Sequence, residues 1–388
     1  MHWIRKSGTV QKKPCLGDWA MDFLLQYDAI AFILVLTSLI YVHELGHYVV
    51  ARMNGVRVEV FSIGFGPEIY GWRNKHGTHW KISLIPFGGY VKMFGDTNIA
   101  SAPMGTDDGM TAEERKVAFP YKKLHQRAAV VAAGPIANFL FAIVVFVGIY
   151  ATLGQAYAPP VVGDFTDDSA AKVHLQVGDR IVSINGNAIT SFSDIQNMTR
   201  LYDRPEPMII TYERQGVQNT VSIQPRREKI TDNLGQTTSI ALLGITTNET
   251  ALRDLPLHRA VPAAFEDTWA IVTGTLTGLW QTITGVRSVK ELGGPVQIYR
   301  ISEKVGEQGI IALVIFAAHL SISLGLINLL PVPALDGGHL VFYFFEALLG
   351  KPLPQKAQEI GAFAGVALIL MLVVVVTWHD VQRILQAG

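Results

Sequence analysis

The sequence predicts a polytopic α-helical membrane protein of about four transmembrane helices, with one soluble α+β domain inserted between them. Two observations lead to this fold class. Of the 388 residues, 49% are hydrophobic and only 16% are charged, and the mean hydropathy is +0.28, whereas soluble domains carry about 25% charged residues. Four apolar runs also reach the roughly 20 residues that a bilayer requires, and they cover residues 29–52, 128–152, 311–330 and 361–378.

Charge and cysteine content exclude several classes of protein and of site. The formal net charge is zero and the isoelectric point is near 7.2, which gives no support to nucleic-acid binding. The single cysteine, Cys15, permits no internal disulfide and no cysteine-rich zinc cluster. A metal site in this chain must therefore be built from histidine, aspartate or glutamate.

The polar segment 1–20 lacks the apolar core of a signal peptide, so we interpret it as an N-terminal extension before a more natural start at Met21. Lysine and arginine collect in the loop 54–126, and the positive-inside rule places this loop in the cytoplasm. The segment 153–310 and both termini then lie outside, although the basic residues within 1–20 favour the reverse orientation.

The first apolar run contains the motif HELGH, with His43, Glu44 and His47. Ionisable groups inside a membrane are costly and generally mark a functional site. Residues four apart share one face of a helix, so both imidazoles can bind one metal ion, and Glu44 can take a proton from the water that the metal activates. Zinc suits such a site, because it leaves one coordination position open. The alternative is a pair of interhelical hydrogen-bonding histidines with a buried glutamate partner.

A third ligand is expected in GLINLLPVPALDGGHL, residues 325–340. Pro331 and Pro333 break the helix there, and non-helical backbone at membrane depth must be buried in protein or line a wet cavity. The break presents Asp336, which is the first candidate for the third ligand. His339 is the rival candidate.

The pattern of short strands and turns in residues 155–228 predicts the soluble domain, with a short helix at 193–201. The pattern SAAKVHLQVGDRIVSINGNAI resembles a PDZ domain, a module that captures extended peptides or C-termini by strand addition. This resemblance implies a peptide-binding loop at Val161, Val162 and Gly163. A spacer that keeps bulky proteins away from the membrane is an equal alternative. Four β-branched runs indicate strands, at residues 161–162, 180–184, 208–213 and 220–224.

Residues 229–310 predict a linker that contains an amphipathic helix, since apolar residues between 261 and 285 recur at helical spacing. The sequence leaves open whether this helix lies on the membrane surface or packs against the soluble domain.

Several motifs together resemble the site-2 protease family of intramembrane zinc metalloproteases. They are HExxH in the first span, N-x-x-P-x-P-x-L-D-G-G late in the chain, the PDZ-like insert, and the stretches GFGP, IPFGGYVKM, QRAAVVAAGPIANF and GGPVQI. The resemblance runs from Met21 to the C-terminus and divides the membrane core into residues 21–152 and 311–388. Bacterial members with a single PDZ domain have the most similar layout.

The resemblance implies a role for each matching residue. It assigns zinc to His43, His47 and Asp336, and the role of general base to Glu44. It implies that Asn328 helps to hold the substrate, whereas a helix-ending cap is the alternative. It also implies a membrane-dipping β-hairpin, for which a plain turn is the alternative. The hairpin would contact the substrate through Gly88, Gly89, Tyr90, Val91 and Lys92.

The resulting prediction is a zinc-dependent intramembrane endopeptidase of the bacterial inner membrane, with its active site toward the cytoplasm and its PDZ domain in the periplasm. The resemblance implies regulated intramembrane proteolysis of single-span membrane proteins, such as trimmed anti-sigma factors or signal-peptide remnants. The other expected partners are the lipid bilayer and a peptide or C-terminus at the PDZ groove. Two rivals are a non-catalytic membrane PDZ adaptor, which has no need of Glu44, and a metal transporter, which has no need of a soluble insert.

Overall fold

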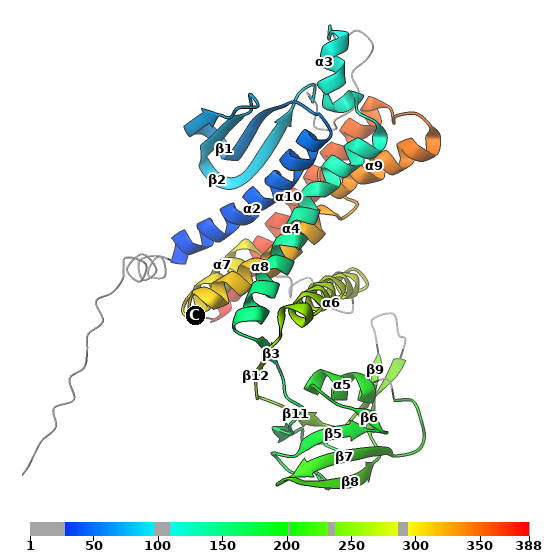
Figure 1. The fold of residues 1–388 in the computed structure, drawn as a ribbon. Coiled ribbons are helices and arrows are strands. Elements are labelled where there is room, and N and C mark those ends of the chain that lie inside the picture. The colour runs from blue at the N-terminus through cyan, green and yellow to red at the C-terminus, as the bar shows by residue number, and fades with distance from the viewer. Residues whose placement is uncertain (1–27, 97–108, 201, 232–236, 286–293, 388) are drawn as a thin grey trace, which may run out of the picture. The chain divides into compact units, whose positions relative to one another are not determined.

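The computed structural model describes residues 28–96, 109–200, 202–231, 237–285 and 294–387 (Figure 1). The predicted extension at residues 1–20 lies outside the described residues. The chain forms two compact units. The helical unit comprises Met1–Val145, Asp267–Thr275 and Val289–Gly388, and the β-rich unit comprises Phe146–Glu266 and Leu276–Ser288.

Four helices in the described part of the chain are long and apolar enough to cross a membrane, as the four apolar runs predict. α10 extends well beyond the predicted run 361–378, and α4 continues as a helix through Pro135. The four are α2 (Asp28–Met53), α4 (Leu124–Thr152), α8 (Ile310–Asn328) and α10 (Gln355–Ala387).

Small residues allow α2 and α4 to approach closely. A Cβ atom on Gly46 would lie 2.7 Å from Ala137 Cβ and would overlap the carbonyl oxygen of Ala133. Membrane helices use such residues at their contacts because the two backbones can then pack directly. The close approach presses the face of α2 that carries HELGH against α4.

A shorter helix, α7 (Pro295–Gly306), contacts α2, α8 and α10. Its first turn is capped from α10, because Asp380 Oδ2 accepts a hydrogen bond from the Gln297 amide at 3.2 Å. Gly294 leaves the space that this carboxylate occupies. A negative charge at a helix N-terminus is stabilising, which gives the GGPVQI stretch a structural role.

The loop after α2 forms a curled sheet of two long strands, β1 (Val58–Arg73) and β2 (His79–Met93). Residues 60–63 of β1 pair with residues 89–92 on one side and with residues 79–82 on the other. Within the described residues, segment 89–93 therefore pairs along one side only and forms an edge of the sheet. The helix α3 (Ala112–Val117) and the 3₁₀ turn η1 (Phe119–Tyr121) follow.

Aromatic side chains fix this sheet to α2. Phe61 is fully buried and stacks on Trp80 with 4.1 Å between ring centroids. Tyr48 of α2 packs edge-on against both rings, at 5.7 and 5.2 Å. The sheet is thereby held one turn from the histidines of HELGH.

The predicted helix break is present between α8 and α9 (Asp336–Leu349). Gly337 and Gly338 pack against the backbone of the break, where any side chain would overlap it. The far end of α9 is tied to α4 by an ion pair between Arg127 Nη2 and Glu346 Oε1 at 2.5 Å, and both side chains are largely buried. The break therefore delivers Asp336 on the first turn of a helix that is anchored at both ends.

The β-rich unit contains a four-stranded antiparallel sheet in the order β6-β5-β7-β8 and the helix α5 (Phe192–Arg200). These strands are β5 (Arg180–Ile184), β6 (Asn187–Ala188), β7 (Met208–Arg214) and β8 (Val217–Ile223). Three two-stranded pairs complete the unit: β3 (Gln155–Tyr157) with β12 (Ala251–Arg253), β4 (Asp164–Phe165) with β11 (Ile245–Thr246), and β9 (Arg226–Thr231) with β10 (Thr237–Leu242).

The structure corrects the predicted end of the soluble domain at residue 228. Strand β9 crosses that residue and β10–β12 lie beyond it, yet β11 and β12 pair with the first strands of the same unit, and Leu243 lies in its core. The predicted strand at 161–162 is only an isolated bridge between Val161 and Arg180. The helix expected within 229–310 is α6 (Leu257–Ile283).

A buried ion pair stabilises the β-rich unit. The Asp179 side chain is 1% exposed and accepts hydrogen bonds from Arg214 Nε and Nη2, at 2.7 and 2.8 Å, and from the Gln176 amide at 2.7 Å. Burial alone would raise the pKa of Asp179, but these donors hold the pKa below its ordinary value. The pair therefore stabilises the fold above about pH 4, and this stabilisation is lost as the pH falls through the lowered pKa.

We expect Asp179→Ala to lower the free energy of unfolding of this unit by about 2 kcal/mol at pH 7, because it removes a buried carboxylate that accepts hydrogen bonds from Arg214 and from the Gln176 amide. Hydrogen exchange over residues 180–223 of the whole protein measures the loss. The matched control is Asp203→Ala, since Asp203 is exposed and pairs with Arg227 at the surface; such a pair contributes under about 1 kcal/mol. Equal protection in the two variants, or a loss that does not shrink below about pH 4, would contradict the assignment.

Candidate metal centre

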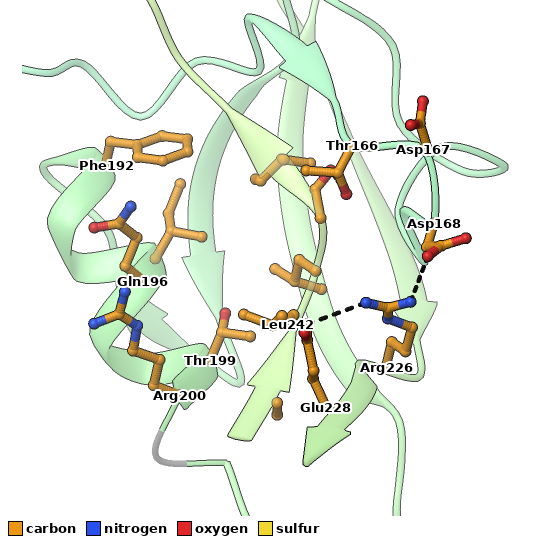
Figure 2. A pocket seen from close by; sticks show the side chains of 15 residues that line it. Thr166, Asp167, Asp168, Phe192, Gln196, Thr199, Arg200, Arg226, Glu228 and Leu242 are labelled. Atoms are coloured by element: carbon orange, nitrogen blue, oxygen red, sulfur yellow. Dashed lines mark hydrogen bonds and ion pairs between the residues drawn. The ribbon is translucent and has the colours of Figure 1, made fainter. Parts of the chain in front are cut away.

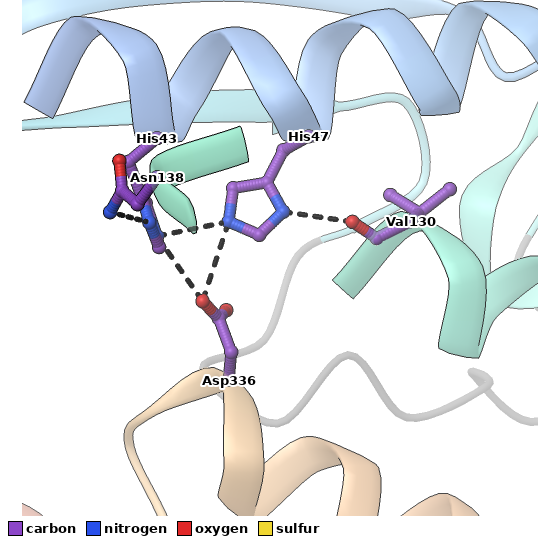
Figure 3. Close-up of polar contacts among 5 residues, drawn as sticks. All are labelled: His43, His47, Val130, Asn138 and Asp336. Atoms are coloured by element: carbon purple, nitrogen blue, oxygen red, sulfur yellow. Dashed lines mark hydrogen bonds and ion pairs between the residues drawn. The ribbon is translucent and has the colours of Figure 1, made fainter. Parts of the chain in front are cut away.

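His43 and His47 lie one helical turn apart on α2, and both are buried against α4. Their Nε2 atoms are 3.2 Å apart. Asp336 of α9 places Oδ2 3.2 Å from His43 Nε2 and 3.5 Å from His47 Nε2 (Figure 3). The structure thus brings together the three residues that were predicted as ligands from two distant parts of the chain.

The arrangement fits a zinc ion. Ligand atoms at 2.0–2.2 Å from a tetrahedral zinc lie about 3.4 Å from one another, close to the three separations observed. Asp336 Oδ2 is near both imidazoles, but it is buried and no described residue donates a properly directed hydrogen bond to it. A metal ion would satisfy this oxygen, and two nitrogens with one oxygen leave the fourth position open.

Gly134 of α4 forms the wall of this centre, a role that the sequence did not reveal. A Cβ atom at Gly134 would overlap His47 Nε2 and lie 2.9 Å from His43 Cε1. Only glycine leaves room for both rings between α2 and α4. Its place in the conspicuous Gly-Pro pair of an apolar run was the available signal.

Both histidines have a partner on the ring nitrogen that faces away from Asp336. His47 Nδ1 lies 2.9 Å from the carbonyl oxygen of Val130 (Figure 3). His43 Nδ1 lies 3.2 Å from the side-chain amide of Asn138. Such partners fix the orientation and the tautomer of metal-binding histidines.

A pocket of about 300 Å³ opens beside the three residues. Glu44 lines it, and the backbone amide of Val91 donates a hydrogen bond to the Glu44 carboxylate. Gly89 keeps this strand close, because a Cβ atom there would lie 3.1 Å from Glu44 Cγ. Asn328 and Tyr90 also line the pocket. The predicted catalytic base and part of the predicted substrate strand therefore line the same pocket.

Three other predicted residues, His339, Gly88 and Lys92, do not join the converging ligand atoms. His339 lines the pocket but is not one of the three residues whose ligand atoms converge. Gly88, with a φ of +114°, packs against the Phe65 ring instead of lining the pocket. Lys92 forms an ion pair with Glu59 at 3.0 Å.

The β-rich unit has its own pocket of about 390 Å³, between α5 and the segment 241–245 (Figure 2). Val161, Val162 and Gly163, where a peptide site was expected, do not line this pocket. Their amides are already bonded to backbone carbonyls, and the Val162 side chain is fully buried. The pocket is apolar at Phe192, Ile195 and Leu243 and carries charge at Arg200, Arg226 and Glu228.

We expect Gly134→Ala to weaken metal binding by at least about tenfold, since inserting a methyl group into a packed site costs about 1–3 kcal/mol. Chelator competition on the purified protein measures this affinity. Gly148→Ala on the same helix is the control, because no atom of the described residues lies within 4 Å of a Cβ atom there. Unchanged affinity in Gly134→Ala, or an equal loss in both variants, would contradict the assigned wall.

Comparisons with known proteins give the family to which the chain is similar. The family model described as Peptidase family M50 matches residues 31–372. A protein of Rhizobium meliloti named as a putative zinc metalloprotease is 43% identical over 365 residues, which cover 92% of this chain and 97% of the relative. Zinc metalloprotease RasP of Geobacillus kaustophilus is 32% identical over 425 residues, at 91% and 97% coverage. Among solved structures, the PDZ domain of an SdrC-like protein from Listeria monocytogenes aligns with 23% of this chain and 87% of its own, at 24% identity and a TM-score of 0.18.

Proposed function

Because the chain belongs to peptidase family M50, we propose that this metalloprotease uses zinc to cut single-span membrane proteins inside the bilayer. The convergence of His43, His47 and Asp336 beside Glu44 is the observation that carries the proposal. HELGH lies on α2, one of the four helices able to cross a membrane, and Asp336 follows the end of another, α8. A peptide bond that reaches this pocket is therefore one that lies in or near the membrane.

Each residue has a defined task in the reaction. His43, His47 and Asp336 would hold the zinc ion, which would supply a Lewis acid for the scissile carbonyl and lower the pKa of water. Glu44 accepts the proton of the attacking water and returns it to the leaving amine. His47 is oriented by the Val130 carbonyl, and the anchored helix α9 holds Asp336 in place.

The edge segment 89–93 gives the substrate a place to dock. A transmembrane helix hides its amide groups in its own hydrogen bonds, so it must unwind before it can be cut. An unwound segment can pair with the free side of this edge, in the manner of strand addition. The Val91 amide, which bonds Glu44, and Asn328 across the pocket are the polar groups nearest to such a segment. The apolar surface of the hairpin, with Phe65, Ile69 and Tyr70 exposed, suits a position dipped into the membrane.

The location and the partners follow from the same proposal. We propose that the zinc site lies on the cytoplasmic side of the bacterial inner membrane and the β-rich unit in the periplasm; the basic loop 54–126 supports this orientation through the positive-inside rule. A peptide or C-terminus is proposed as the occupant of the pocket beside α5, where Arg200 could meet a carboxylate; Arg226 is already paired with Asp168 and Glu228. Substrates are single-span proteins already trimmed outside, or signal-peptide remnants.

The proposal is tested by reconstituting the protein in liposomes with a single-span substrate and mapping the products by mass spectrometry. We expect one main cut within the transmembrane segment, which stops when a zinc chelator is added and resumes when zinc is restored. Cuts confined to exposed loops would refute the intramembrane assignment. Zinc flux across the liposome without cleavage would indicate a transporter, and peptide binding without cleavage an adaptor.

A further inference from the structure

The two histidines of the centre are held by different kinds of partner. His47 Nδ1 faces a backbone carbonyl, that of Val130 at 2.9 Å. A carbonyl only accepts, so the His47 proton belongs on Nδ1, and Nε2 presents a lone pair toward Asp336. His43 Nδ1 lies 3.2 Å from the side-chain nitrogen Nδ2 of Asn138. An amide both donates and accepts, and a half-turn about its terminal bond exchanges the two.

The orientation of this amide decides which nitrogen of His43 carries the proton. With Asn138 Nδ2 toward the ring, the amide donates to Nδ1, and the proton of a neutral His43 sits on Nε2, the atom that faces Asp336. With Oδ1 toward the ring, the amide accepts from Nδ1–H, and Nε2 is free to bind a metal. Only the second arrangement matches the tautomer that the carbonyl of Val130 imposes on His47.

Asn138 lies between packed helices, where burying a polar side chain costs free energy. It is fully buried, and its Oδ1 has no hydrogen-bond partner within the described residues. α8 packs tightly against it, because a Cβ atom on Gly325 would lie 3.2 Å from Asn138 Cβ. Its backbone carbonyl accepts a hydrogen bond from Ser321 Oγ at 2.9 Å. A buried amide that leaves one group unpaired calls for a functional reason.

We propose that Asn138 is a positioning residue that selects the metal-binding tautomer of His43, by turning Oδ1 toward Nδ1. This inference rests on the proposed zinc site, but not on the nature of the substrate. Partners of this kind typically change metal affinity by 10–100-fold when they are removed. Each ring then has one acceptor at Nδ1: the backbone carbonyl of Val130 for His47, and the side-chain oxygen of Asn138 for His43.

The test compares zinc affinity, measured by chelator competition on the full chain, among three substitutions. Asn138→Leu and the smaller Asn138→Ala have no acceptor, and we expect each to bind zinc 10–100-fold more weakly than the unaltered protein. Asn138→Asp keeps an acceptor on the Nδ1 side, so its affinity should stay within about threefold of the unaltered protein or exceed it. Thermal unfolding of the chelator-treated proteins shows whether a lower zinc affinity reflects a folding defect. If Asn138→Leu does not fold, Asn138→Ala still tests the inference.

The matched control is Ser321→Ala. It removes the hydroxyl that donates to the backbone carbonyl of Asn138 and leaves the side-chain amide of Asn138 unchanged. We expect this control to bind zinc as the unaltered protein does. The inference is overturned if Asn138→Ala keeps full zinc affinity, or if Asn138→Asp binds zinc as weakly as Asn138→Ala does. It is also overturned if Ser321→Ala loses as much zinc affinity as Asn138→Ala. Cleavage by the unaltered protein is measured alongside. Normal zinc binding without cleavage would refute the proposed function and leave the role of Asn138 standing.

Discussion

Replacing Glu44 with glutamine is expected to leave zinc binding intact and to reduce cleavage by at least about 10³-fold. Glutamine keeps the size of the side chain and can still meet the Val91 amide, but it cannot take a proton from water. General acid–base groups contribute about 10²–10⁴-fold, and Glu44 would act in both halves of the reaction. The measurement is the turnover of a single-span substrate in liposomes, together with the zinc content of the same preparation.

Glu59→Gln is the matched control for this variant. Glu59 lies on β1, where its carboxylate pairs with Lys92 of β2, and it does not line the pocket. The control should cut at the rate of the unaltered protein. Full cleavage by Glu44→Gln would remove Glu44 from the chemistry, and loss of zinc from that variant would make it a ligand.

Replacing Asp336 with alanine is expected to abolish stoichiometric zinc binding and, with it, cleavage. Two imidazoles from one helix would remain, and a catalytic zinc site normally uses three protein ligands. The affinity should fall by more than the 10–100-fold that loss of an outer partner costs. Metal analysis after dialysis against a weak chelator detects the loss without any assay of cleavage.

His339→Ala tests the rival ligand in the same experiment. His339 lies one turn beyond Asp336 in the same pocket, but outside the group of converging atoms. This variant should retain its zinc. If His339→Ala loses the metal and Asp336→Ala keeps it, the third ligand is wrongly assigned.

Part of this molecule follows from the sequence for simple physical reasons. A bilayer imposes a minimum apolar length, so the four apolar runs predict the four long helices. The period of the α-helix predicts that His43 and His47 share a face, as they do. Proline in a helix interior removes a hydrogen bond, and the break before Asp336 follows Pro331 and Pro333.

The contribution of α4 to the centre does not follow in this way. Gly134 and Asn138 are four residues apart and therefore share a face of α4. The sequence of α4 alone does not predict which helix packs against that face. That depends on the packing of α4 against α2 and α8, where Gly46 and Gly325 permit the close approach. A small residue and a buried polar residue at helical spacing are a general sign of such a contact.

The β-rich unit was predicted less well, because its strands are short. β4, β6 and β11 have two residues each, too few to show an alternating pattern. The domain boundary was therefore placed too early. The pocket was also missed, since one of its walls, the segment 241–245, lies beyond that boundary.

Anomalous diffraction at the zinc edge from crystals of the full chain tests the central claim most directly. The account predicts one strong peak, within about 2.0–2.2 Å of His43 Nε2, His47 Nε2 and a carboxylate oxygen of Asp336. A peak elsewhere in the molecule, or one coordinated without Asp336, would contradict it.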